Sequence, residues 1–137
     1  MTITDVSYNL SNSKRWITNT YFFDLETRFE DGKHMANFAC AITCDGYEFT
    51  AEGYYCVPRF LNHFRCSKYI GHTWLDHNAA GFYNILLLEH FTNMGVTPQV
   101  MMTGCRVTYM YDARFKQRFI DSYSFIPMRL ANTTAAF

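Results

Sequence analysis

The fold is decided around residues 20–26, which read Thr-Tyr-Phe-Phe-Asp-Leu-Glu. Aromatic and β-branched residues in a short run are typical of a buried strand. Residues two apart in a strand point to the same face, so Asp24 and Glu26 are expected to present two carboxylates side by side where this strand ends. Paired carboxylates of this kind can bind a hard cation such as Mg²⁺.

Turn residues and hydrophobic periodicity divide the rest of the chain into further strands and helices. The expected elements are, in order, strands over 20–26, 35–43 and 47–55, a helix over 59–66, a strand over 70–75, a helix over 79–94 and a hairpin within 100–125. Turns are expected at 30–33, 44–47 and 112–114. This order favours an α/β fold of the RNase H type, with a mixed sheet and flanking helices.

Length and composition indicate one folded domain. The chain has 137 residues, of which 49% are hydrophobic and 18% charged, so it lies outside the composition range of disordered chains. Residues 1–17 are polar and rich in Asn and Ser, which predicts an N-terminal arm, and residues 18–137 are expected to form the domain.

Charge and cysteine content narrow the class of partner and the compartment. Twelve basic residues balance twelve acidic ones, so the net charge gives no long-range attraction to nucleic acid or to an anionic membrane. Five cysteines without a CxxC pair predict an intracellular protein with reduced thiols and no structural zinc site. The longest strongly apolar run, residues 85–88, is too short to span a bilayer, so no membrane partner is expected.

Four stretches carry a more specific signal. They are Tyr-Phe-Phe-Asp-Leu-Glu-Thr at 21–27, Asp-Gly-Lys-His-Met-Ala-Asn-Phe at 31–38, His-Asn-Ala-Ala-Gly-Phe at 77–82 and Phe-Ile-Asp-Ser-Tyr-Ser-Phe-Ile-Pro-Met-Arg-Leu at 119–130. In order and spacing they resemble the 3′→5′ exonuclease domain of protein-primed family B DNA polymerases, most closely the linear-plasmid and transposon-derived Polinton (Maverick) branches. The resemblance covers about residues 18–137 and implies a DnaQ-like exonuclease fold.

The resemblance also implies a two-metal nuclease, with Mg²⁺ or Mn²⁺ as the cofactor of an active member. Asp24 and Glu26 match the metal-binding acids of its first motif. Contacts to nucleic acid are implied for four residues, Thr27, His77, Asn78 and Phe82.

The pattern departs from the family at Tyr83, which stands where the second motif has a metal-binding aspartate. A phenol has a reference pKa of about 10 and is neutral at physiological pH, so it cannot supply the missing charge. The third motif, a Tyr followed four residues later by Asp, has no counterpart before Phe137. Asp76 and Asp121 are conceivable substitutes, although Asp121 is interpreted as a structural strand end. We therefore expect at most one weakly held cation, no cofactor requirement and little or no hydrolysis.

These observations favour a pseudoenzyme, a noncatalytic exonuclease-like domain that serves as a protein-interaction or scaffolding module, with the nucleus as one candidate compartment. Four tyrosines could form its partner surface, Tyr54, Tyr55, Tyr109 and Tyr111. One alternative is binding of single-stranded DNA or RNA, with His77 and Phe82 stacking on bases and basic residues meeting phosphates. Those basic residues are Arg114, Lys116, Arg118 and Arg129. Another alternative is a still active exonuclease fragment. The oligomeric state stays open.

Overall fold

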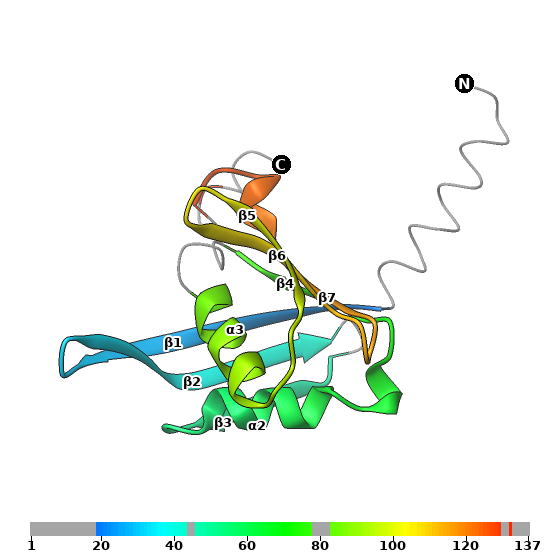
Figure 1. Ribbon diagram of the computed structural model, residues 1–137, viewed down its shortest axis with the longest axis horizontal. Helices are drawn as coiled ribbons and strands as arrows, with labels where there is room; N and C mark the ends of the chain where they lie inside the picture. Colours follow the sequence, from blue (N-terminus) through cyan, green and yellow to red (C-terminus); the bar gives the residue numbers. More distant parts are fainter. Residues whose placement is uncertain (1–18, 44–45, 78–82, 130–131, 133–137) are drawn as a thin grey trace, which may run out of the picture.

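The computed structural model describes residues 19–43, 46–77, 83–129 and 132. They form a seven-stranded mixed sheet and two α-helices, which confirms the predicted α/β class (Figure 1). The elements are β1 (Thr20–Glu30), β2 (Lys33–Thr43), β3 (Glu48–Glu52), α2 (Cys56–Phe64), β4 (Thr73–Asp76), α3 (Tyr83–Asn93), β5 (Gln99–Thr103), β6 (Arg106–Asp112) and β7 (Gln117–Asp121), with 3₁₀ turns at Ser67–Tyr69 and Ser122–Ser124. Neither α-helix of this described part is long and apolar enough to cross a membrane.

Some predictions fall outside the described residues. They are the arm at 1–17, Cys44 and Asp45 of the predicted turn, the start of the predicted helix at 79–82, and the site residues Asn78 and Phe82.

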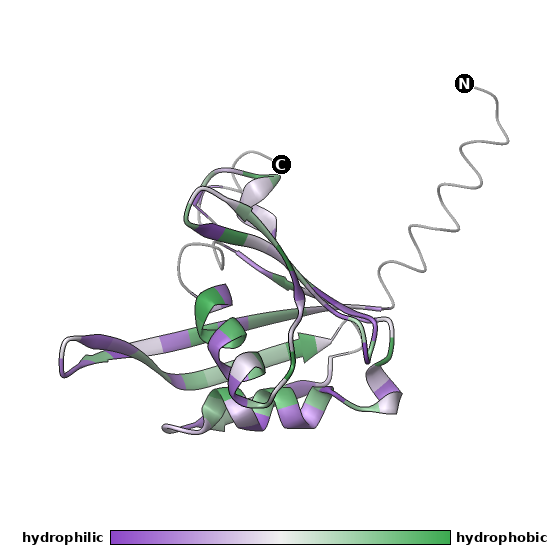
Figure 2. Ribbon diagram, in the orientation of Figure 1, coloured by the Kyte–Doolittle hydropathy of each residue, from purple (hydrophilic) through white to green (hydrophobic). Residues whose placement is uncertain are grey.

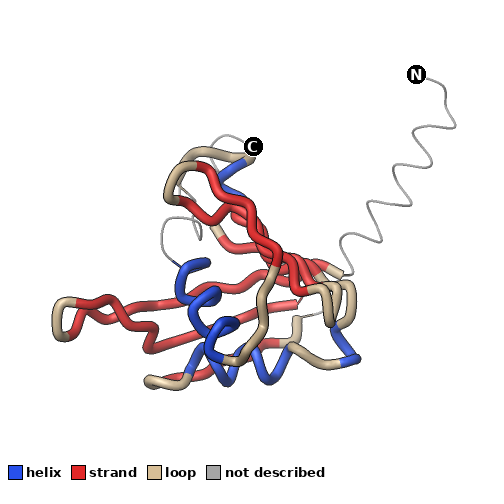
Figure 3. Tube along the Cα trace, in the orientation of Figure 1, coloured by secondary structure: helices blue, strands red, loops and turns tan. Residues whose placement is uncertain are grey.

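The order of strands across the sheet is β3-β2-β1-β4-β7-β6-β5. β4 runs parallel to both β1 and β7, whereas every other neighbouring pair is antiparallel. The reader can follow this continuous sheet, with both helices beside it, in Figure 3. The carboxyl ends of β4 and β7 therefore meet at one edge, and β1 passes this edge near Asp24 before it continues to Glu30 in the hairpin with β2. This edge is called the acidic edge below, since each of the three strands carries an aspartate there.

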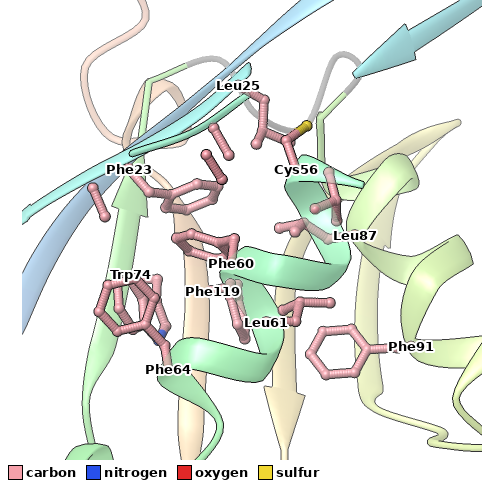
Figure 4. Packing of buried hydrophobic residues seen from close by; sticks show 14 of the residues in the cluster. Phe23, Leu25, Cys56, Phe60, Leu61, Phe64, Trp74, Leu87, Phe91 and Phe119 are labelled. Atoms are coloured by element: carbon pink, nitrogen blue, oxygen red, sulfur yellow. The ribbon is translucent and has the colours of Figure 1, made fainter. Parts of the chain in front are cut away.

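Aromatic rings fill the space between the sheet and the two helices (Figure 4). Trp74 of β4 stacks beside Phe119 of β7, with the ring centroids 6.3 Å apart. Phe64 of α2 packs on Trp74 at 4.5 Å, and Phe91 of α3 packs on Phe119 at 5.7 Å. Hydrophobic and hydrophilic residues alternate along α2, which matches a helix that buries one side (Figure 2). Both helices therefore cover the same face of the sheet.

A row of apolar side chains crosses the opposite face of the sheet. Each member pairs in register with the next on the neighbouring strand, and we call the set the open-face row: Ile42, Phe22, Leu75, Ile120, Tyr109 and Met101. Phe22 is 49% exposed and Met101 is 63% exposed. The two α-helices bury the other face, so the open-face row forms apolar surface on this one.

Several boundaries differ from the sequence-based expectation. α2 begins at Cys56 and not at 59, because Pro58 lies in its first turn, where a missing N–H breaks no helical hydrogen bond. The C-terminal region holds three strands and not two, because Gly104, at φ 62°, turns the chain between β5 and β6. β3 is shorter than predicted and leaves Tyr54 and Tyr55 in the loop before α2.

The turn between β1 and β2 confirms the prediction at 30–33. Asp31 and Gly32 have φ values of 48° and 77°, and this pair of positive angles is typical of a two-residue hairpin turn. Gly32→Ala is expected to lower the free energy of unfolding by about 1 kcal/mol, because an L-residue at positive φ is strained. A Cβ there would meet nothing within 4 Å, so no steric clash adds to this cost.

Urea denaturation measures this difference, with Lys33→Ala as the control, since Lys33 is exposed and is expected to change stability by less than about 0.5 kcal/mol. Equal stability of the Gly32→Ala protein and the wild type would contradict the strain argument.

Candidate functional site

The acidic edge is built from the same local sequence three times. An aromatic residue, an apolar residue and an aspartate stand at 22–24, 74–76 and 119–121. Asp76 and Asp121 are direct partners in the parallel pairing of β4 and β7. β1 and β4 pair only as far as Phe22 and Leu75, so Asp24 lies just beyond the last pair, where β1 leaves β4.

Strand alternation places Asp24 and Glu26 on the same face, as predicted, but not at the strand's end, because β1 continues to Glu30 in the hairpin with β2. Both are exposed and flank Leu25, which is fully buried. Asp24 accepts a hydrogen bond from the Leu25 N–H at 2.9 Å. Partial burial raises the pKa of Asp24 above its ordinary value, and the Glu26 carboxylate acts in the same direction. The β1–β2 pairing is irregular between Glu26 and Thr27, a bulge that sets the half-buried Thr27 apart from the acids.

Asp76 is a buried acid whose importance sequence reasoning underestimated. Its side chain is 6% exposed, and one carboxylate oxygen accepts a hydrogen bond from the His77 N–H. The other oxygen, Oδ2, is buried and has no hydrogen-bond partner among the described residues. Burial, and next the Asp24 carboxylate, raises the pKa of Asp76 to about 8. Asp76 is therefore mostly protonated at neutral pH.

Asp121, unlike Asp76, is held by an ion pair and a hydrogen bond. It is fully buried, its carboxylate lies 3.6 Å from the Arg106 guanidinium, and it accepts a hydrogen bond from the Tyr123 N–H at 3.0 Å. Through that bond it caps the 3₁₀ turn Ser122–Ser124. These contacts are those of a structural strand end, the interpretation favoured from the sequence.

Tyr83 opens α3 beside the acids. Burial raises the pKa of its phenol, and the carboxylates of Asp24, Glu26 and Asp76 raise it further, in that order. The hydroxyl is therefore neutral at physiological pH and lies within electrostatic reach of all three carboxyl groups. The fold thus brings together Tyr83 and the acidic pair, as the resemblance implied.

His77 is fixed by hydrogen bonds through both ring nitrogens. Nε2 donates to the Met128 carbonyl at 2.7 Å, and Nδ1 lies 2.9 Å from the Ser122 hydroxyl. That hydroxyl in turn donates to the backbone carbonyl of Asp76 at 3.0 Å. A ring with both nitrogens engaged can offer only its face to a nucleic acid base, and the ring of Tyr123 already lies 5.6 Å away.

A cavity of about 310 Å³ opens beside these groups. Its lining combines carboxyl, imidazole and hydroxyl groups with apolar side chains: Phe22, Phe23, Asp24, Leu75, Asp76, His77 and Ser122. It is large enough for a hydrated cation, because one water occupies about 30 Å³ of liquid.

Three of the four basic residues lie away from His77. Arg114 and Lys116 belong to the β6–β7 turn, and Arg118 lies near the start of β7, with its guanidinium 5.8 Å from the centre of the Tyr111 ring. The start of β7 is at the opposite end of the strand from Asp121. Arg129, by contrast, directly follows Met128, whose carbonyl oxygen accepts the hydrogen bond from His77. Of the four basic residues in the nucleic-acid alternative, only Arg129 therefore lies near His77.

The four tyrosines proposed as a partner surface are also divided. Tyr54 and Tyr55 are exposed in the loop before α2, with ring centroids 5.6 Å apart. Tyr109 and Tyr111 are half-buried on β6, and only Tyr109 belongs to the open-face row. The four tyrosines thus come from two different elements, and their role as a partner surface stays a prediction.

The two-metal centre implied by the resemblance does not fit the residues present. No three His, Cys, Asp or Glu side chains in the described part of the chain are placed to hold a metal ion together. Tyr83 contributes no charge, and Asp121 is already paired with Arg106. Of the remaining acids, Asp24 and Glu26 are exposed and Asp76 is buried.

Neither a protein-family model nor a curated protein sequence matches the chain. Two solved polymerases are similar to it in structure. The Phi29 DNA polymerase complexed with primer-template DNA matches with a TM-score of 0.68 at 12% identity, over 86% of this chain and 23% of that chain. The family B DNA polymerase from the hyperthermophilic archaeon Pyrobaculum calidifontis matches with a TM-score of 0.57 at 16% identity, over 79% of this chain and 16% of that chain.

The chain has the fold of a polymerase exonuclease domain. It spans less than a quarter of the length of either polymerase, and at these identities the likeness establishes the fold alone. The mixed sheet with its two helices is thus shared, whereas the chemistry of the acidic edge has to be argued from the chain's own residues.

Proposed function

We propose that this chain is a noncatalytic exonuclease-like module, which works by binding a partner and not by hydrolysing nucleic acid. The observation that carries the proposal is Tyr83, a neutral phenol placed beside Asp24 and Glu26. Two-metal hydrolysis needs a second cation to stabilise the leaving oxygen, and that cation needs carboxylate ligands. With the phenol in place of a carboxylate, the edge lacks the negative charge for two cations.

Two features support a protein as the partner. The open-face row offers apolar surface that neither described α-helix buries, with Phe22 49% and Met101 63% exposed. Exposed contiguous apolar surface is typical of protein interaction sites. The net charge of zero also favours a protein over a polyanion, because affinity for nucleic acid comes largely from phosphate neutralisation.

A nuclease assay tests the proposal. The full chain is incubated with labelled single-stranded DNA and Mg²⁺ or Mn²⁺, next to an Asp24→Asn/Glu26→Gln double variant. We expect the two proteins to release label at the same background rate, because no two-cation centre forms in either. Faster release by the wild type, lost in the double variant, would show an active exonuclease and refute the proposal.

Binding of single-stranded nucleic acid is the second candidate, and one observation favours it. The half-exposed ring of Phe22 lines the cavity beside Asp24, where it could stack on a terminal base. Anisotropy of the same oligonucleotide, measured without cation, distinguishes a nucleic-acid partner from a protein partner. Binding that weakens steeply with salt and on Phe22→Ala would favour nucleic acid as the partner.

A further inference from the structure

We propose that the open face of β1, β2 and β3 binds an amphipathic helix of a partner protein, one whose apolar side is bordered by Lys or Arg residues. We call this surface, which lies opposite the two α-helices, the β1–β3 face. The inference rests on the proposed function, since it gives the protein partner a chemistry. It concerns the half of the open face where apolar and acidic side chains lie together.

An apolar line runs along β2 in the middle of the β1–β3 face. Strand alternation places Ile42, Cys40 and Phe38 on this line, whereas Ala39 and Ala41 between them are buried on the face that packs on the helices. Ile42 is 42% exposed, and Cys40 and Phe38 are half-buried. Neither described α-helix covers this line, so it offers apolar surface to a partner.

Acids border this apolar line on both sides. On β1 they are Asp24 and Glu26, and on β3 they are Glu48 and Glu52. Each of them stands beside a residue of the apolar line in the strand register. All four are exposed, and none forms an ion pair with a described residue. Their charges are therefore available to a basic partner.

A cavity of about 280 Å³ opens on this face. Phe22 and Ile42 line it together with Asp24 and Glu48. Burial, and next the Asp24 carboxylate, raises the pKa of the Cys40 thiol in the same lining, as a negative potential in the cavity requires. Such a groove attracts apolar side chains that are accompanied by positive charge, whereas it repels the phosphates of a nucleic acid.

The width of the groove fits a helix. Neighbouring strands lie about 4.8 Å apart, so the acids of β1 and those of β3 are separated by about 10 Å across β2. An α-helix with its side chains is about 10–12 Å wide. A helix lying along β2 would thus rest its apolar side on the apolar line and bring both of its borders next to acids. Lys and Arg suit these borders, because their stems pack on apolar surface while their charged ends reach outward.

Titration calorimetry of the full chain with a synthetic peptide tests the inference. The probe is an amphipathic peptide of about 18 residues, with Leu along one side and Lys along both borders. We expect one peptide to bind per chain, with an affinity that decreases as salt is added. The affinity is expected to fall about three- to tenfold in Asp24→Asn/Glu26→Gln and in Glu48→Gln/Glu52→Gln, because each exposed ion pair contributes only a small part of it.

Asp31→Asn/Glu89→Gln is the matched control, since it removes the same charge from exposed positions of the hairpin turn and of α3. This variant is expected to bind the peptide as the wild type does. A peptide with Glu in place of Lys should not bind. Equal affinities in all three double variants, or no binding of the Lys peptide by the wild type, would overturn the inference.

A second measurement needs no variant and so does not depend on the folding of one. In NMR spectra of the wild type, the Lys peptide is expected to shift the amide signals of Ile42 and Cys40 on β2 more than that of Leu87 on α3. Shifts confined to α3 would contradict the inference, and so would the same β2 shifts produced by a single-stranded oligonucleotide alone. Neither measurement involves DNA cleavage, so failure of the β1–β3 face and failure of the noncatalytic proposal are distinguished.

Discussion

Asp76→Asn is expected to remove a pH dependence of stability that the wild type shows between pH 3.8 and about 8. In the folded protein, burial and the neighbouring Asp24 raise the pKa of Asp76, whereas the unfolded chain has the ordinary value. Between the two values the folded state holds a proton that unfolding releases, so rising pH favours unfolding. Each pH unit in this window lowers the free energy of unfolding by about 1.4 kcal/mol through this group.

The direction of this pH dependence and the pH range over which it acts can be measured directly. Stability from this group is fully present below pH 3.8 and is lost as the pH rises through about 8, on the order of 5 kcal/mol over the window as an upper figure. Urea denaturation at several pH values, without divalent cations, gives the slope for each protein. Asparagine does not titrate, so its curve should be flatter than that of the wild type, and Glu89→Gln should keep the wild-type slope. Parallel curves for Asp76→Asn and the wild type would show that Asp76 titrates normally.

Asp112→Ala is expected to lower the free energy of unfolding by about 3–5 kcal/mol. The Asp112 carboxylate lies 2.7 Å from Nε of Arg65, and the two side chains are only 1% and 10% exposed. The guanidinium also lies against the rings of Phe91 and Phe115, at 5.4 Å and 5.1 Å from their centres. Without its counter-ion, this charge would remain in an apolar, aromatic environment.

Thermal and urea unfolding measure the loss, and a double-mutant cycle built from Arg65→Met and Asp112→Leu isolates its cause. Arg65→Met leaves Asp112 buried and unpaired, so it should also destabilise. The double variant Arg65→Met/Asp112→Leu should recover most of the stability, because replacing a buried pair with apolar side chains is often neutral. A double variant as unstable as the sum of the two single variants would show that the loss is one of packing and not of charge.

The local parts of the structure could be predicted from the sequence because they depend on neighbours in the chain. The turn at Asp31 and Gly32 follows from residues that tolerate positive φ, and the exposed pair Asp24 and Glu26 follows from strand alternation. α3 follows from helical periodicity, which predicts a helix over 79–94. None of these features requires knowledge of which strands pair.

The rest of the site depends on pairing between distant segments. Asp76 and Asp121 meet only because β4 and β7 are parallel partners, and no pattern within either strand states that pairing. One signal could have been used, the repetition of aromatic, apolar and Asp at 22–24, 74–76 and 119–121. The same three-residue pattern in three buried strands is a reason to expect their aspartates to lie at one edge, although only β4 and β7 end at that residue.

The direction of β7 separates Arg118 from the acidic edge. The nucleic-acid alternative groups Arg118 with His77 as contacts to one bound strand. Arg118 and Asp121 belong to one short strand, so its basic start and its acidic end necessarily lie at opposite edges of the sheet. A net charge summed over a segment contains no information about this direction.

The β1–β2 hairpin has a practical consequence for experiments with immobilised protein. At Gly32, in the turn between β1 and β2, an added Cβ would meet open space. β1 runs from Asp24 out to this turn. A short affinity tag inserted between Asp31 and Gly32 would therefore attach the molecule to a sensor surface by the tip of the hairpin. The carboxyl ends of β4 and β7 would stay accessible to dissolved ions and oligonucleotides.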